Sequence, residues 1–162
     1  MKKHSLRWAT AGVGLALSLS LVTLPSVAEE HEHHDVSGHE LQLNAGQKWQ
    51  TDAPLRQAMT KIATALNADL DDIHNNKLDA AGYEALAEQV NQQVAYMVEN
   101  CQLEPQADAQ LHIVIARLVD SAQRMQNQNA LPEKRKGAVQ LVGALGDYAK
   151  YFSDADFVKP VH

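Results

Sequence analysis

Apolar residues recur every three or four positions in four stretches of the chain after residue 50. This spacing places the apolar side chains on one face of an α-helix, so each stretch is predicted to be helical. Thr51 and Asp52 are good N-cap residues for the first helix, which has Pro54 in its first turn. The second helix is expected to start near Asp79, the third follows Pro105, and the fourth has Pro132 in its first turn. The predicted buried positions are Leu55, Met59, Ile62, Leu66, Leu70 and Ile73; Tyr83, Leu86, Val90, Val94, Met97 and Cys101; Leu111, Ile115, Leu118, Ala122 and Met125; and Val139, Val142, Leu145, Tyr148 and Phe152.

The connections between these stretches are short, at residues 75–78, 102–106 and 127–131. Short connections make consecutive helices antiparallel neighbours. The sequence therefore predicts an all-α fold, an up-down-up-down four-helix bundle that spans residues 51–162. Residues 40–43 could form a strand, but no second strand is predicted to pair with them.

Residues 1–28 have the pattern of a cleavable secretory signal peptide. Lys2, Lys3 and Arg7 make a basic start, residues 9–24 are apolar apart from glycine, serine and threonine, and a small-x-small cleavage motif ends at Ala28. An uncleaved membrane anchor is the alternative, but the apolar run is short for a span of about 20 residues. We therefore expect a periplasmic protein that is not held at the membrane after cleavage.

Cleavage after Ala28 also changes the charge balance. It removes three of the 14 lysine and arginine residues and none of the 20 aspartate and glutamate residues, so the net charge falls from −6 to −9. An acidic chain without a basic stripe does not suit nucleic acids or anionic membrane surfaces, and it does suit a cationic partner. Cys101 is the single cysteine, so an internal disulfide is excluded.

Residues 29–50 form a polar leader without sustained periodicity, which we expect to be flexible and attached to the bundle at Trp49. Imidazole and carboxylate groups are dense in this leader, and at such density they bind divalent metals even without a fixed fold. The alternative is a polar tether that binds metal only loosely. The candidate ligands are His31, His33, His34 and His39.

Cleavage after Ala28 would place a histidine third from the new N-terminus, in the order Glu29, Glu30, His31. The free α-amine, two deprotonated backbone amides and one imidazole nitrogen of such a sequence form a square-planar ligand set, which suits Cu(II) or Ni(II). We therefore expect the leader to capture copper, zinc or nickel. A cut one residue away would abolish the third-position arrangement.

Stacking the four helices predicts a second group of metal ligands at one end of the bundle. At the rise of an α-helix, Met59, Met97 and His112 lie roughly 6–9 Å below this end, with Cys101 at its rim. Thioether, thiolate and imidazole are the soft ligands that select Cu(I). Asp108 precedes His112 by one helical turn and is placed to orient its ring.

Packing is the alternative for this group, because Met59, Met97 and Cys101 also fall on the apolar faces and are common core residue types. Haem b is the second cofactor that the bundle is expected to suit, with Met59 and His112 as axial ligands on facing helices. Covalent haem attachment is excluded because the chain has no Cys-x-x-Cys-His motif.

Motifs for catalysis are absent from the sequence, which has no Gly-rich phosphate loop, no nucleophile elbow, no His-Glu-x-x-His and no Glu-x-x-His pair. An enzyme is therefore not expected. Lys134, Arg135 and Lys136 begin the fourth helix, where the helix dipole disfavours cations. A docking surface for a partner is one interpretation of these residues, but we expect them simply to be exposed.

Two short motifs occur in the chain, W-x-T-D-x-x-L-R-x-x-M at residues 49–59 and N-C-x-L-x-P-x-A-D-x-x-L-H at residues 100–112. In these motifs the chain resembles a family of small exported helical proteins of Gram-negative bacteria. The resemblance covers the bundle and leaves the leader outside. It implies a periplasmic helical bundle and no catalytic residues. Its motif members include Trp49, Met59, Cys101, Asp108 and His112.

These observations favour a periplasmic transition-metal binding protein, copper first, that acts as a buffer or carrier. The alternative is a helical adaptor or stress-response binding protein that holds no metal, in which another periplasmic protein is the partner. A small haem b electron carrier is the third candidate.

Overall fold

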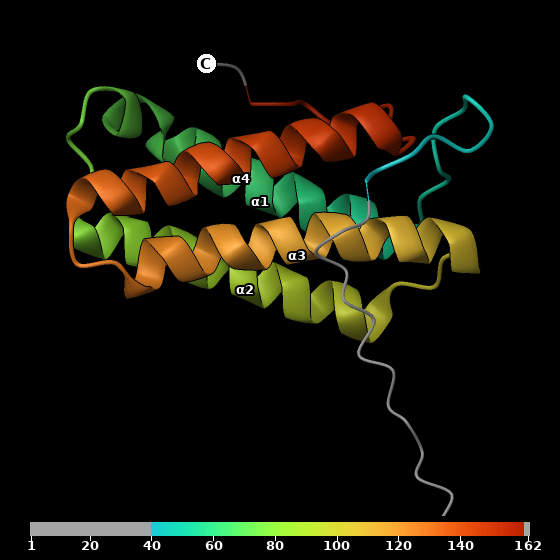
Figure 1. The fold of residues 1–162 in the computed structure, drawn as a ribbon, viewed down its shortest axis with the longest axis horizontal. Helices are drawn as coiled ribbons and strands as arrows, with labels where there is room; N and C mark the ends of the chain where they lie inside the picture. The colour runs from blue at the N-terminus through green and yellow to red at the C-terminus, as the bar shows by residue number, and fades with distance from the viewer. Residues whose placement is uncertain (1–39, 161–162) are drawn as a thin grey trace, which may run out of the picture. The chain divides into compact units, whose positions relative to one another are not determined.

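The structure is a computed structural model that describes residues 40–160. The predicted signal peptide and the histidines of the leader therefore lie outside the described residues. Within them the chain forms four helices (Figure 1). The helices are α1 (Ala53–His74), α2 (Ala80–Asn100), α3 (Pro105–Asn127) and α4 (Leu131–Tyr151). The all-α prediction and the number of helices are confirmed.

Aspartate side chains cap the first two helices, at Asp52 as predicted and at Asp79, near which the second helix was expected to start. The carboxylate of Asp52 accepts a hydrogen bond from the Leu55 N–H at 2.9 Å, and that of Asp79 accepts one from the Gly82 N–H at 2.8 Å. Both bonds satisfy backbone donors that have no partner inside the first turn of a helix. A proline occupies the first turn of α1, α3 and α4, where its missing N–H costs nothing.

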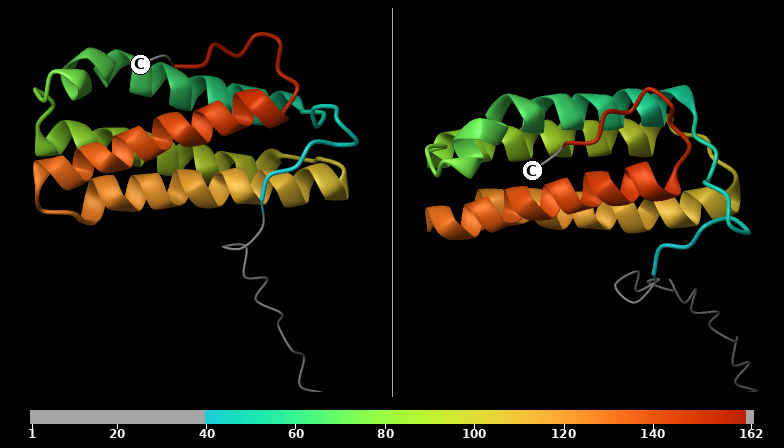
Figure 2. Two further views of the ribbon diagram at one scale, coloured as in Figure 1. Left: turned by 45° about the horizontal axis from the view of Figure 1, so that its top comes forward. Right: turned by 90° about the horizontal axis from the view of Figure 1, so that it is seen from above.

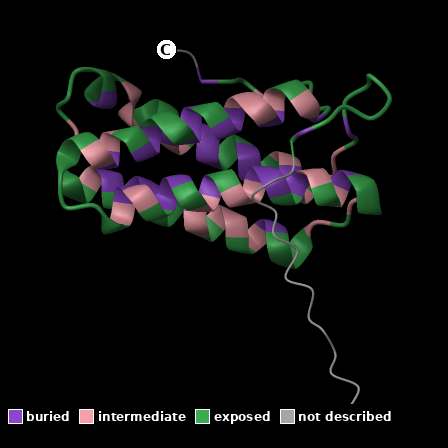
Figure 3. Cartoon of the chain, viewed as in Figure 1, coloured by how far each residue is buried: buried purple, intermediate pink, exposed green. Residues whose placement is uncertain are grey.

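Consecutive helices pack against each other, and α1 and α4 also meet, so the four helices form a closed up-down-up-down bundle (Figure 2). Each helix turns one apolar face inward, and the buried positions lie along these inner faces (Figure 3). Burial of these faces is the main force that holds the helices together, because each helix alone would be marginal in water.

One predicted core position on α4 is wrong. Val139 is 48% exposed, whereas Ala138 and Leu141 are buried. Ala138 takes the inward position beside Gly137, where α3 and α4 approach closely. A Cβ atom at Gly137 would lie 2.8 Å from the Met125 Cγ atom and 2.9 Å from the Ser121 carbonyl oxygen.

The folded part begins earlier than the predicted boundary at residue 51. Leu41 and Trp49 are buried against the bundle. The backbone N–H of Trp49 donates a hydrogen bond to the backbone carbonyl of Tyr151 at 2.8 Å. The described residues hold no strand at 40–43; isolated bridges occur only further on, between Asn44 and Gln47 and between Trp49 and Phe152. The end of the leader is therefore attached beside the last turn of α4, at Trp49 as expected.

Residues after α4 turn back along the bundle (Figure 2). Phe157 packs edge-on against Tyr148, with ring centroids 4.9 Å apart, and the Tyr148 hydroxyl donates to Asp154 at 2.8 Å. Between residues 40 and 160, none of the helices combines the length and the apolar character that crossing a membrane requires.

Candidate functional site

The predicted methionine ligands are core residues. Met59 has no exposed surface and Met97 is 1% exposed, and both belong to the cluster of buried apolar side chains. Methionine fills irregular spaces in such cores. The burial of both side chains therefore supports the packing alternative for these two residues.

Cys101 lies half-buried where α2 ends. Burial, followed by the charge and hydrogen bonding of Asp52 and then the charge of Asp108, raises the pKa of its thiol to about 12. The thiolate, not the thiol, is the strong metal ligand and nucleophile. Without a metal, Cys101 is thus a thiol at neutral pH.

His112 faces solvent on the outer side of α3, with 57% of its side chain exposed. Its Nδ1 atom lies 2.9 Å from the Asp108 carbonyl oxygen and 3.4 Å from the Asp108 carboxylate. Asp108 therefore orients the imidazole ring, as the sequence predicted. The exposed ring and the fully buried Met59 occupy different environments, which gives no support to a haem held between them.

Within residues 40–160, no group of three or more His, Cys, Asp and Glu side chains is placed to bind a metal ion. The copper ligands predicted in the leader, His31, His33, His34 and His39, lie outside the described residues. What the structure places is the point at which the leader joins the bundle. There a hollow of about 540 Å³ is lined by residues that include Trp49, Asp52 and Leu103.

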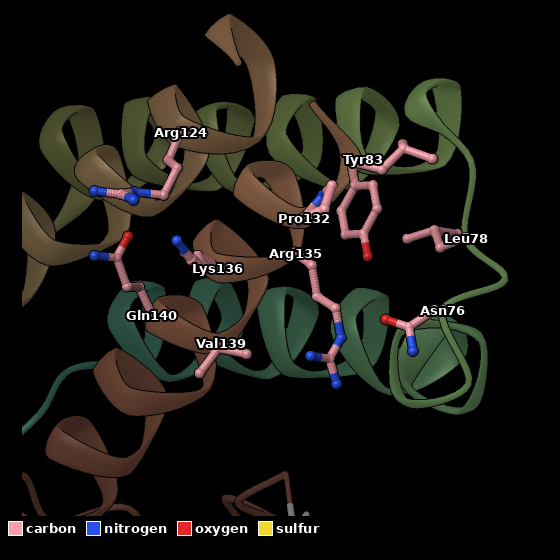
Figure 4. A pocket seen from close by; sticks show the side chains of 10 residues that line it. Asn76, Leu78, Tyr83, Arg124, Pro132, Arg135, Lys136, Val139 and Gln140 are labelled. Carbon is pink, nitrogen blue, oxygen red and sulfur yellow. The ribbon is translucent and has the colours of Figure 1, made fainter. Parts of the chain in front are cut away.

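The opposite end of the bundle holds a groove that the sequence did not predict. It lies where α1 and α3 end and α2 and α4 begin, and it has a volume of about 810 Å³ (Figure 4). Leu78 comes from the α1–α2 connection, Tyr83 from α2 and Arg124 from α3, while α4 supplies Arg135 and Val139. No single segment could have revealed the groove, because its walls come from four parts of the chain.

The basic start of α4 departs from the expected exposure. Lys134 is 3% exposed, and its ammonium donates to the carbonyls of Met125 at 2.7 Å and Gln126 at 3.2 Å and to Glu84 at 2.9 Å. The prediction that Lys134 is exposed was wrong because the C-terminus of α3, with its unpaired carbonyls, lies beside the N-terminus of α4. The negative end of one helix dipole thus offsets the positive end of the other.

Arg135 makes the corresponding contact with α1. Its Nε–H donates to the Ile73 carbonyl at 3.0 Å, in the last turn of that helix. Lys136 is exposed as expected and pairs with Glu133 at 2.6 Å. Two of the three basic residues therefore join α4 to the ends of its neighbours, and a role in helix capping explains them without a partner.

Comparison with known proteins found no family model, no curated protein and no solved structure that matches the chain. The resemblance in the motifs at residues 49–59 and 100–112 therefore stays a prediction.

Proposed function

We propose that the protein binds a transition metal in the periplasm and acts as a buffer or carrier rather than as a catalyst. Copper is the metal that we favour. The observation that carries the proposal is the presence of four histidines within residues 31–39, with Glu32 and Asp35 among them. Imidazole nitrogens are good ligands for copper, zinc and nickel, and carboxylates beside them add charge that attracts a cation.

The acidic balance of the chain supports the same partner. The net charge is −6 for the whole sequence and −9 after the expected cleavage. Negative charge raises the local concentration of cations and speeds their association. The bundle would serve as the folded body to which the metal-binding leader is attached through Trp49.

A titration of the chain from residue 29 tests the proposal. We expect it to bind Cu(II), Zn(II) or Ni(II) at micromolar concentration, and we expect a variant with alanine at positions 31, 33, 34 and 39 to bind at least about tenfold more weakly. His112→Ala is the matched control, because it removes an exposed imidazole outside the leader. Equal affinity of the leader variant and the parent chain would refute the proposal.

The N-terminal arrangement can be tested separately. If Glu29 is the first residue, adding one alanine before it moves His31 from the third to the fourth position. Cu(II) and Ni(II) binding should then weaken, whereas Zn(II) binding should not, because zinc has no preference for a square plane. The intact mass of protein isolated from the periplasm determines whether the cut follows Ala28. A mass that retains residues 1–28 would contradict the expected cleavage.

A further inference from the structure

The groove between the ends of α1 and α3 and the starts of α2 and α4 has the size and lining of a ligand site. Its volume of about 810 Å³ falls within the range of roughly 300–1,000 Å³ that small-molecule sites occupy. Leu131 and Val139 line it and are 45% and 48% exposed, so apolar surface that the bundle does not cover faces water there. An apolar group that covered these side chains would bind favourably.

The charged side chains around the groove favour a ligand that carries one negative charge. Arg124 and Lys136 both pair with Glu133, at 3.4 Å and 2.6 Å. Arg135 has no carboxylate partner among residues 40–160, although its Nε–H is fixed on the Ile73 carbonyl. The guanidinium is thus held in place with donors left over, and planar guanidinium groups bind carboxylates through paired hydrogen bonds.

Tyr83 supplies a second donor beside Arg135. The residue is 2% exposed, and its hydroxyl has no hydrogen-bond partner within the described part of the chain. Figure 4 shows this hydroxyl directed into the space bordered by Arg135, Asn76 and Leu78. Gln93 Oε1 is the one fully enclosed side-chain oxygen or nitrogen without a partner in residues 40–160, so the Tyr83 hydroxyl opens to the groove. The side chain is therefore held by packing, while its hydroxyl is free to donate a hydrogen bond to a ligand in the groove.

We propose that this groove binds an aliphatic carboxylate, with the carboxylate on Arg135 and the Tyr83 hydroxyl and the alkyl chain on the apolar lining. Burial raises the pKa of Tyr83, and the charge of Arg135 only partly offsets this, so the hydroxyl is protonated at neutral pH and donates. One unpaired guanidinium in a chain of net charge −6 suits a monoanion and disfavours a polyanion such as a nucleotide. This site is independent of the metal-binding leader.

Calorimetric titration of the chain from residue 29 with dodecanoate, in metal-free buffer, tests the proposal. Two comparison ligands separate the contributions, dodecyltrimethylammonium for the charge and butanoate for the alkyl chain. We expect dodecanoate to bind below about 1 mM and each comparison ligand to bind at least about tenfold more weakly. The failure of dodecanoate to bind, or equal binding of the cationic amphiphile, would overturn the proposal.

Variants locate the site. Arg135→Gln and Tyr83→Phe should each weaken dodecanoate binding, about tenfold or more for the arginine because a charge-assisted contact is lost. Since Arg135 also contacts α1, Val139→Glu provides a test that leaves the packing intact, by adding negative charge at an exposed position in the groove. Val98→Glu is its control, because Val98 is 70% exposed on α2 and does not line the groove.

The two valine variants give opposite expected results. Val139→Glu should abolish dodecanoate binding, and Val98→Glu should retain it with unchanged affinity. Equal loss or equal retention in both would overturn the placement in the groove. The alanine variant of the four leader histidines should bind dodecanoate as the parent chain does, so failure of this proposal and failure of the metal proposal are distinguishable.

Discussion

The indole N–H of Trp49 donates to the backbone carbonyl of Gln42 at 2.6 Å. The backbone N–H of Gln42 in turn donates to the Gln110 side chain on α3 at 2.8 Å. These two bonds fix residues 42–49 as a loop against the bundle. His39 precedes this ordered loop by only three residues in the chain, so the proposed metal-binding leader is joined directly to a rigid support.

Lys134 is predicted to stabilise the bundle. Lys134→Met keeps the length and packing of the side chain but leaves the carbonyls of Met125 and Gln126 without their donor. Because hydrogen bonds to a charged group are involved, the free energy of unfolding should fall by about 2–3 kcal/mol. Urea denaturation followed by circular dichroism measures this.

Lys136→Ala is the control for that variant, because Lys136 is exposed and its pairing with Glu133 lies at the surface. Its free energy of unfolding should change by about 0.5 kcal/mol or less. Similar losses in the two variants would contradict the buried role of Lys134.

Gly137 is predicted to be required by the close approach of α3 and α4. In Gly137→Ala the new methyl group would contact the Ser121 carbonyl and the Met125 backbone, atoms that cannot move without shifting α3. The expected cost is at least about 1 kcal/mol in the free energy of unfolding. Gly143 lies on the same helix with no atom within 4 Å of the position of a Cβ, so Gly143→Ala should stabilise by about 0.5–1 kcal/mol. A stabilising Gly137→Ala would refute the account of this contact.

Cys101 is predicted to react slowly with alkylating agents. With a pKa raised to about 12, its thiolate fraction at pH 8 is far below that of an unfolded cysteine. Alkylation of the folded chain by iodoacetamide should be at least about a hundredfold slower than in urea. Asp52→Asn should accelerate the reaction, since it removes the negative charge that raises the pKa of the thiol most. A folded rate equal to the rate in urea would contradict the raised pKa.

The same shift makes stability depend on pH. A thiol whose pKa is higher in the folded than in the unfolded state contributes stability that is complete below the unfolded pKa of 9.0 and is lost as pH rises toward about 12. The free energy of unfolding should therefore fall between pH 9 and 12. In Cys101→Ala the fall should be smaller, with a remainder from Tyr83 and Tyr148, whose pKa values burial also raises. An unchanged slope in Cys101→Ala would contradict this.

Helix periodicity was enough to predict the bundle because most apolar side chains in it point to one core. The caps at Asp52 and Asp79 were predictable for a related reason, since a capping bond spans only three residues. The contact of Asp108 with His112 is also local, one turn along α3. These features depend on sequence neighbours, which a single sequence displays.

Features built from distant segments were not predictable in this way. The burial of Lys134 depends on carbonyls at the end of another helix, and the inward face of α4 depends on the fit of Gly137 against Met125. The groove required Tyr83 and Arg135 to meet across two helices, which no spacing in the sequence indicates. Two of the four ligands predicted at the end of the bundle, Met59 and Met97, are buried like ordinary core side chains.

Metal analysis of the native protein is the most direct test of the central claim, that the histidine-rich leader binds a transition metal. The protein would be isolated from the periplasm without chelators, dialysed and analysed for copper, zinc and nickel beside the variant with alanine at the four leader histidines. We predict about one equivalent or more of metal, copper first, in the parent protein and almost none in the variant. Metal-free parent protein that also takes up no copper, zinc or nickel at micromolar concentration would contradict the claim.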